Sequence, residues 1–348
     1  MAITIGTPGD DVLQPGPGDH VALMLNGNDR FIWNPGDGSD TVLGGRGADT
    51  LEFNGADAVE TFTVSGDDDD GVELFRDVGN ILMDLDQVEA IALNALGEDD
   101  VIDASALHAS DVDLIVNGGT GNDRAILGAG DDDFIWNPGD GSDFVDGRHG
   151  TDTLVFNGAD APELFALTDS QNGVQLFRDV GNIVMDLENV ERVEVNGLGE
   201  DDVIDASGVT KPVELSADGG DGHDLITGGG GHDFLAGGTG SDIVDGGLGD
   251  DLVTGGADAD RFKFTGTDFG DNIIGDWERE DILLLDQVQL ADGTPVTEVG
   301  QIDTNVDGLL NGDDDSFDVV DGDLVMTLQG GSAFVAGFDQ IGANVEIA

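Results

Sequence analysis

The sequence predicts an all-β protein in which glycine-rich nonapeptides stack into a parallel β-roll, or β-solenoid, with β-rich spacers and a C-terminal β cap. Residues 219–263 hold five consecutive units of the pattern G-G-x-G-x-D-x-U-x, where U is a large apolar residue. Such short tandem repeats are typical of solenoids, because one unit cannot bury its apolar face alone. The acids are also biased, with 60 Asp against 15 Glu, which favours turns over long helices.

Looser copies of the nonapeptide fill nine further stretches of the chain. They lie at 6–14, 15–23, 24–32, 35–43, 44–52, 118–126, 127–135, 138–146 and 147–155. Position six is Asp in 13 of the 14 units, the exception being His20. Position eight is Leu, Ile, Val or Phe in 12 of them, so the pattern predicts one acidic and one apolar column along the stack.

The two halves of the nonapeptide predict different structures. The glycines allow the positive φ of a tight turn, whereas x-U-x predicts a short strand with its middle residue pointing inward. With two units per coil, the Asp of one turn faces the turn two units further on. Stacked carboxylates repel one another unless a cation lies between them, and carboxylate and carbonyl oxygens suit Ca²⁺.

The pattern resembles the calcium-binding nonapeptide of the RTX, or hemolysin-type, family of bacterial proteins that type I machines secrete. The resemblance implies that the position-six carboxylates bind calcium and that turn glycine carbonyls complete each site. The implied carboxylate ligands are Asp11, Asp29, Asp40, Asp49, Asp123, Asp132, Asp143, Asp152, Asp224, Asp233, Asp242, Asp251 and Asp260. The glycines are Gly220, Gly222, Gly229, Gly231, Gly238, Gly240, Gly247 and Gly249. With one ion bridging units i and i+2, we expect about eight ions in the rolls.

The repeats divide the chain into six parts. The β-roll tracts are 1–52, 118–155 and 219–263, the β-rich spacers are 53–117 and 156–218, and the C-terminal cap is 264–348. The second spacer duplicates the first, since the run L-F-R-D-V-G-N at 74–80 recurs at 176–182. Alternating apolar and polar residues predict strands within the spacers, and each Gly-Asn pair in that run predicts a two-residue hairpin turn.

Arg76 and Arg178 recur at equivalent places in the two spacers. Each has two interpretations: it pairs with a nearby Asp, or it binds a ligand. We expect pairing, because 11 Lys and Arg face 75 Asp and Glu in this chain.

A second calcium motif lies in the C-terminal part. Residues 303–314 resemble the loop of an EF-hand or a dockerin, with a glycine at the sixth position for the sharp turn. The predicted ligands are Asp303, Asn305, Asp307, Leu309 through its carbonyl, Asn311 and Asp314. The twelfth residue is Asp rather than the usual Glu, and the alternative is a solvated acidic loop.

Composition excludes several classes of protein. The formal charge of −64 opposes nucleic-acid binding, no apolar run approaches the ~20 residues of a membrane span, and the absence of Cys excludes disulfides. The first residues contain no Sec-type signal peptide, whereas the resemblance implies export by a type I machine that reads an uncleaved C-terminal signal. We therefore expect a secreted, extracellular protein. Neither H-E-x-x-H nor G-x-S-x-G occurs, and we expect no enzyme.

Two classes of function remain. The first is a secreted calcium-binding protein whose rolls fold on binding Ca²⁺ outside the cell, with a structural or adhesive role at a cell surface or matrix. The alternative is an accessory or cryptic carbohydrate-active protein that binds or modifies polysaccharide. Trp33 and Trp136, at equivalent positions, bear on this choice, and we expect them to be packing residues. The partners are thus calcium, the type I secretion machinery, and a cell surface or a polysaccharide.

Overall fold

The computed structural model describes residues 1–67, 71–108, 112–266, 269–289 and 295–296, and beyond these the backbone of six strands between 309 and 347. Every regular element among these residues is a β-strand, which confirms the all-β prediction. No helix in the described part has the length and hydropathy needed to cross a membrane.

The chain forms two compact units. The first comprises Met1–Phe156, Ser170–Gln175 and Ile183–Arg192, and the second comprises Asn157–Asp169, Leu176–Asn182 and Val193–Ala348. The boundaries predicted for the tracts, spacers and cap differ from the boundaries of these two units, and they stay a prediction.

The strands are short throughout. Up to residue 157 they are β1 (Ala2–Ile5), β2 (Val12–Leu13), β3 (His20–Asn26), β4 (Arg30–Trp33), β5 (Thr41–Arg46), β6 (Thr50–Asp57), β7 (Thr61–Asp67), β8 (Gly71–Arg76), β9 (Ile81–Asp86), β10 (Ala90–Gly97), β11 (Val101–Leu107), β12 (Asp113–Asn117), β13 (Arg124–Ile126), β14 (Asp133–Trp136), β15 (Phe144–Asp146) and β16 (Thr153–Asn157). From residue 164 they are β17 (Leu164–Asp169), β18 (Gly173–Arg178), β19 (Ile183–Glu188), β20 (Arg192–Asn196), β21 (Val203–Gly208), β22 (Glu214–Asp221), β23 (Leu225–Thr227), β24 (Phe234–Thr239), β25 (Ile243–Asp245), β26 (Leu252–Ala257), β27 (Arg261–Thr265), β28 (Gly270–Ile274), β29 (Ile282–Asp286), β30 (Leu309–Asn311), β31 (Phe317–Val320), β32 (Asp323–Leu328), β33 (Gly331–Val335), β34 (Gln340–Gly342) and β35 (Val345–Ile347).

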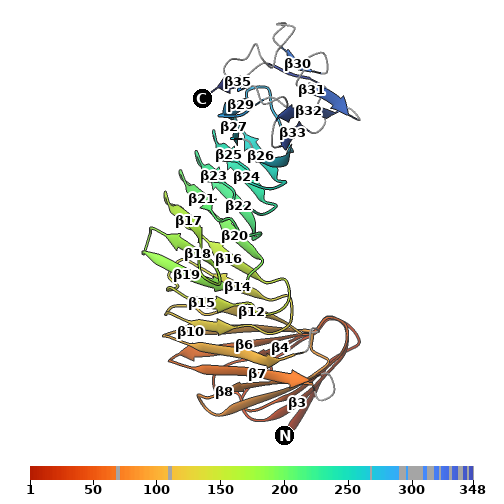
Figure 1. Cartoon of the computed structure of the whole chain (residues 1–348). Helices are drawn as coiled ribbons and strands as arrows, with labels where there is room; N and C mark the ends of the chain where they lie inside the picture. The colour runs from red at the N-terminus through yellow and green to blue at the C-terminus, as the bar shows by residue number, and fades with distance from the viewer. Residues whose placement is uncertain are drawn as a thin grey trace. The chain divides into compact units, whose positions relative to one another are not determined.

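Two nonapeptides make one coil of the roll. In the second unit β23, β25 and β27 pair in parallel, which aligns Leu225, Ile243 and Arg261 at steps of 18 residues. The nonapeptides between these strands form the opposite sheet, where Phe234 of β24 lies beside Leu252 of β26. The strands of each unit are thus the stacked rungs seen in Figure 1, which confirms the predicted β-roll.

The core between the two sheets is the predicted apolar column. Its position-eight residues are fully or almost fully buried in every nonapeptide after the first: Ala22, Phe31, Val42, Leu51, Ala125, Phe134, Val145, Leu154, Ile226, Leu235, Val244, Val253 and Phe262. Burial of each large apolar side chain contributes about 1.5–3 kcal/mol relative to exposure. The apolar column therefore supplies much of the stability that the short strands lack individually.

The two Trp-Asn insertions place a large aromatic side chain in this core. Trp33 is fully buried and stacks on Phe53 with ring centroids 4.2 Å apart, and its indole N–H donates to the carbonyl of Gly38 at 2.8 Å. Trp136 repeats this arrangement on Phe156, with centroids 4.0 Å apart. Both Trp are packing residues, as the sequence predicts.

The first spacer continues the parallel ladders and adds a meander. β10 pairs in parallel with β6 on one side and with β12 on the other. β7, β8 and β9 pair antiparallel in the other sheet, between β5 and β11. The hairpin predicted at Gly79-Asn80 is present, but Arg76 pairs with Ile81, so its turn has four residues rather than two. Gly79 and Asn80 both take positive φ, so the Gly-Asn pair forms the second half of a longer turn.

The C-terminal strands cover the last rungs of the second unit, which confirms the predicted β cap. β29 pairs in parallel with β27 and then with β35, whereas β28 pairs with β33 and begins an antiparallel run through β32 to β31. The calcium loop predicted at 303–314 lies outside the described residues, except for the backbone of β30, which pairs antiparallel with β34.

The close stacking of turns predicts a strong effect of a single methyl group. Gly240 has φ +120°, and a Cβ at this position would lie 1.6 Å from the carbonyl oxygen of Gly222, one coil earlier. We expect Gly240→Ala to lower the free energy of unfolding in calcium by at least about 1–2 kcal/mol, the cost of left-handed backbone alone. Thermal unfolding followed by circular dichroism measures the change.

Gly9→Ala is the matched control, because a Cβ there meets nothing within 4 Å. Equal melting temperatures for the two variants would contradict the stacking of the turns.

Candidate calcium-binding turns

The predicted carboxylate ligands form buried columns along the turns. Twelve of the 13 are less than 4% exposed: Asp29, Asp40, Asp49, Asp123, Asp132, Asp143, Asp152, Asp224, Asp233, Asp242, Asp251 and Asp260. Asp11, in the first turn, is half-buried. Carboxylates are rarely buried unless they are paired, so the partners of these oxygens decide what the turns can do.

One oxygen of each of the twelve buried carboxylates accepts a hydrogen bond from the turn one coil earlier. Asp242 Oδ1 accepts from the Asp224 N–H at 2.7 Å, and Asp260 Oδ1 accepts from the Asp242 N–H at 2.9 Å. On the opposite side of the roll, Asp251 Oδ1 accepts from the Asp233 N–H at 2.9 Å. Turns two units apart therefore face one another.

The second oxygen is buried without a hydrogen-bond partner in most of these turns. Among the predicted ligands this is true of Oδ2 in Asp29, Asp49, Asp123, Asp152, Asp224, Asp242, Asp251 and Asp260. A buried polar atom without a partner costs about 1–3 kcal/mol, and more when it is charged. A regular column of such oxygens indicates a place for cations.

Backbone carbonyls converge on the same space. A Cβ on Gly237 would lie 2.4 Å from Asp242 Oδ2 and 2.5 Å from the carbonyl oxygen of Gly255. A Cβ on Gly219 would lie 2.3 Å from Asp224 Oδ2 and 2.6 Å from the carbonyl oxygen of Gly237. A carboxylate oxygen of one turn and a carbonyl oxygen from the turn two units later therefore meet beside a glycine.

The predicted glycine carbonyls differ in their surroundings. The carbonyl oxygens of five of them each lie so close to a glycine one coil later that a Cβ on that glycine would clash with them. These five are Gly220, Gly222, Gly231, Gly238 and Gly249. The carbonyl of Gly229 accepts a hydrogen bond from the Leu248 N–H at 2.8 Å and also lies near Gly247.

The chemistry of these donors fits calcium. The described residues contain no group of three or more His, Asp or Glu side chains placed to hold a metal ion. An ion in a turn would therefore take much of its coordination from backbone carbonyls. Such a set consists of hard oxygen donors, which Ca²⁺ prefers and which the softer transition metals do not require.

Burial raises the pKa of eleven of these carboxyl groups above the ordinary 3.8. The pKa of Asp251 rises to about 8, mainly by desolvation and further by the negative charge of Asp233. Desolvation raises the pKa of Asp260 and of Asp143 to about 7, and that of Asp224 to about 6. At neutral pH the turns thus take up either protons or another cation.

Comparison with known families decides which repeat this is. The RTX calcium-binding nonapeptide repeat matches the chain in four copies, at residues 36–55, 115–135, 216–244 and 227–262. The chain therefore carries RTX calcium-binding repeats. Like other RTX repeats, those of this chain bind calcium, while the number of ions and the atoms that hold each one stay predictions.

No curated protein matches the chain. Among solved structures, it is similar to the extracellular lipase LipA from Serratia marcescens, with 14% sequence identity and a TM-score of 0.25. The match covers 100% of this chain and 40% of the lipase, so the chain spans less than half the length of that lipase.

The acidic columns extend beyond the matched repeats. Asp100 and Asp202 are buried, each has an unpartnered Oδ2, and burial raises the pKa of each to about 7. The nonapeptide pattern identifies neither Asp. At Asp100, Leu96 and Glu98 stand where the glycines of the pattern belong. These two residues adopt φ of +82° and +73° all the same. The signal was an Asp followed two residues later by a buried Ile, in the run D-V-I that both spacers contain.

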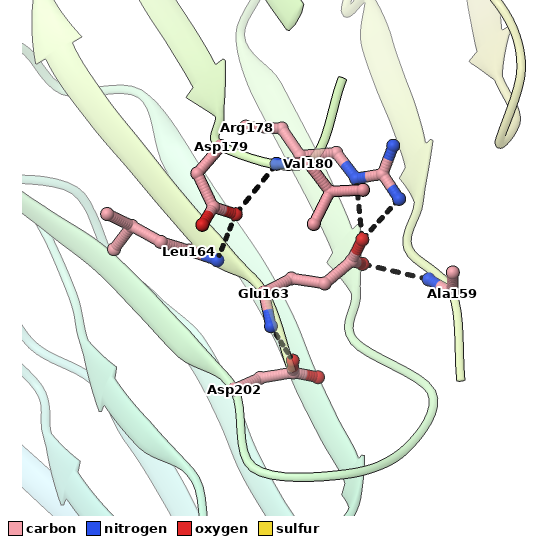
Figure 2. A network of polar contacts seen from close by, with 7 residues as sticks. All are labelled: Ala159, Glu163, Leu164, Arg178, Asp179, Val180 and Asp202. Carbon is pink, nitrogen blue, oxygen red and sulfur yellow. Dashed lines mark hydrogen bonds and ion pairs between the residues drawn. The ribbon is translucent and has the colours of Figure 1, made fainter. Parts of the chain in front are cut away.

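Arg76 and Arg178 are paired, although not with Asp. Arg76 pairs with Glu60, and Arg178 pairs with Glu163 as Figure 2 shows. The expected pairing is thus present with a different partner, because a buried Glu reaches each guanidinium from an adjacent turn.

The raised pKa values predict an unusual pH dependence for the calcium-free protein. An Asp whose folded pKa exceeds its unfolded value stabilises the fold below about pH 3.8, and this contribution is lost as pH rises through the folded pKa. With folded values between about 6 and 8, the loss falls between about pH 4 and pH 8. We expect chelated protein to show more β-structure and a higher melting temperature at pH 5.5 than at pH 8. A circular dichroism signal that is stronger at pH 8 would contradict this.

Removal of one column carboxylate should act with opposite signs in the two calcium states. With chelator, Asp242→Ala removes a buried charge with an unpartnered oxygen and should not destabilise the roll. Asp233→Ala also removes two backbone hydrogen bonds, from the Leu215 and Gly229 N–H groups, so its effect in chelator should be the less favourable of the two. With calcium they remove a ligand, and a lost site takes away about 2.7 kcal/mol at 100 times its Kd. The calcium midpoint, measured by circular dichroism, should therefore rise.

Asp218→Ala is the matched control for these variants, since Asp218 is exposed in the same roll. Midpoints equal to that of the wild type in both column variants would contradict the assignment of the ligands.

Proposed function

We propose that the chain is a secreted calcium-binding protein whose β-rolls fold when calcium binds outside the cell. The folded protein has a structural or adhesive role at a cell surface or in a matrix. The observation that carries this proposal is the repeated buried carboxylate oxygen without a partner in the turns of the rolls.

Without a cation, the folded roll holds rows of like charges at neutral pH. Desolvation and mutual repulsion then oppose folding, as the raised pKa values of Asp251 and Asp152 illustrate. Calcium that binds the folded state alone adds RT ln(1 + [Ca²⁺]/Kd) per site, or about 2.7 kcal/mol at 100 times Kd. Several sites together match the whole stability of an ordinary domain, which is about 5–15 kcal/mol.

This linkage suits a protein that changes compartment. Where free calcium is below micromolar, the net charge of −64 favours an expanded chain that fits a type I secretion channel. Where calcium is millimolar, the turns fill and the rolls form. We include secretion in the proposal because proteins with RTX repeats are typically secreted.

The structural or adhesive role has more support than the carbohydrate-active alternative. Trp33 and Trp136 are fully buried and offer no face for stacking on a sugar ring. Among the exposed large apolar side chains of the described residues, Phe234 is the one aromatic, so it forms no aromatic strip.

A calcium titration followed by far-ultraviolet circular dichroism tests the gated fold. Chelated protein should lack most of the β-signal at pH 7.5, and the signal should appear cooperatively as calcium rises towards millimolar. Magnesium at the same concentration is the control, because its smaller octahedral shell suits the turns poorly. An unchanged β-signal and melting temperature after exhaustive chelation would contradict the proposal.

A further inference from the structure

The first turn of each spacer carries Glu where the repeat carries Asp. Residues 55–63 read G-A-D-A-V-E-T-F-T and residues 158–166 read G-A-D-A-P-E-L-F-A, with Glu60 and Glu163 at position six and Phe at position eight. The geometry supports this alignment. A Cβ on Gly55 would lie 2.5 Å from Glu60 Oε2 and 2.7 Å from the carbonyl oxygen of Ala95, as at the Asp turns.

The two Glu belong to the same columns as the Asp. The Glu60 N–H donates to Asp100 Oδ1 at 2.7 Å, and the Glu163 N–H donates to Asp202 Oδ1 at 2.8 Å. Both Glu side chains are buried, with Glu60 fully so. Each therefore lies where the neighbouring turn has an Asp with an unpartnered oxygen.

Both oxygens of each Glu, in contrast, have partners. Glu163 Oε2 accepts from the Ala159 N–H at 2.8 Å, and Oε1 accepts from the Arg178 Nε at 2.8 Å and from its Nη2 (Figure 2). Glu60 repeats the pattern, since its Oε1 accepts a hydrogen bond from the Arg76 Nε–H at 2.6 Å. Arg76 and Arg178 are themselves 4% exposed, so each guanidinium is a buried cation in the column of acids.

The inserted strands bring the arginines to these turns. Arg76 ends β8 and Arg178 ends β18, and the residue after each is an Asp that is anchored on the Glu turn. Asp179 Oδ1 accepts from the N–H of Leu164, the residue after Glu163, at 2.9 Å (Figure 2). Asp77 Oδ1 accepts from the Thr61 N–H in the first copy, also at 2.9 Å.

The Glu turns also lack the backbone shape of the calcium turns. Position two is Ala56 in one copy and Ala159 in the other, and neither has the positive φ found at Gly220 or Gly238. Instead the Ala58 N–H donates to the Ala56 carbonyl at 2.8 Å, which closes a three-residue turn. This carbonyl is thus occupied by a hydrogen bond within its own turn.

We infer that Arg76 and Arg178 are built-in cations that take the place of calcium at the turns of Glu60 and Glu163. Each spacer then neutralises its own buried carboxylate, and the Glu turn with its arginine-bearing strand folds in the absence of calcium. These two sites provide formed rungs onto which the calcium-dependent turns stack. The inference rests on the proposed calcium-gated fold.

Hydrogen exchange on the full chain, read by mass spectrometry with chelator and with millimolar calcium, tests this role. In chelator, amides of 61–66 and 164–180 should be protected, whereas those of 225–265 should exchange freely. Calcium should then protect 225–265. Protection of every region in chelator would overturn the gated fold itself. No protection of the spacers in chelator, with calcium-dependent protection everywhere, would overturn the inference and leave the gated fold intact.

Arg178→Met distinguishes a substitute cation from an ordinary structural ion pair. In chelator, this variant leaves Glu163 buried and unpaired, so protection of 164–180 should fall by about 100-fold or more. Glu163 Oε2 and the carbonyl oxygens of Asn196 and Gly197 all lie beside Gly158, so oxygen donors remain at this turn although its position-two carbonyl is occupied. If the arginine replaces calcium, millimolar calcium should therefore restore that protection. Full protection of the variant in chelator, or its failure to recover in calcium, would overturn the inference.

Two controls isolate the effect. The double variant Glu163→Met/Arg178→Met has no buried charge at this turn, so protection of 164–180 should persist in chelator and change little with calcium. Arg30→Met removes an arginine that is half exposed and pairs with Glu52 at 3.1 Å, and its exchange should match the wild type. A calcium response in the double variant as large as in Arg178→Met would show that the rescue comes from neighbouring turns and would overturn the inference.

Discussion

The repulsion between stacked carboxylates is the constraint on which the rest of the structure depends. Adjacent strands of a parallel sheet lie about 4.8 Å apart, so a residue that repeats once per coil places like charges at about that spacing. At an effective dielectric constant of 20, each such pair costs about 3–4 kcal/mol. One backbone N–H per carboxylate, as between Asp224 and Asp242, offsets only part of this cost.

The apolar column and the acidic column have different consequences. Position-eight side chains such as Phe262 and Leu235 are buried in the folded roll, and their burial favours that fold whatever the ionic conditions. The carboxylates decide when that fold is stable, because their charge has to be neutralised. Protons, calcium and guanidinium are three ways to do so, and the chain supplies the third itself at Glu60 and Glu163.

Much of the site was readable from the sequence because the pattern and the geometry share a period. A repeat of nine residues, with two repeats per coil, puts Asp233 and Asp251 in one column, and glycine marks turns whose left-handed backbone disfavours a side chain. The pattern does not predict a turn where a residue other than glycine adopts the left-handed backbone that it disfavours. Leu96 and Glu98 take left-handed backbone at a cost of about 1–2 kcal/mol each, which neighbouring rungs offset, so the turn of Asp100 was not recognised.

The sequence by itself determined the fold class, the positions of most columns and the demand for cations, since all three follow from local periodicity and composition. Tertiary structure alone decided which charges meet. The partner of Arg178 is Glu163, 15 residues away and across an inserted strand, and no local pattern specifies that contact. The Arg178–Glu163 contact depends on the register between rungs that are distant in sequence. That register depends in turn on how each coil packs around the buried apolar column.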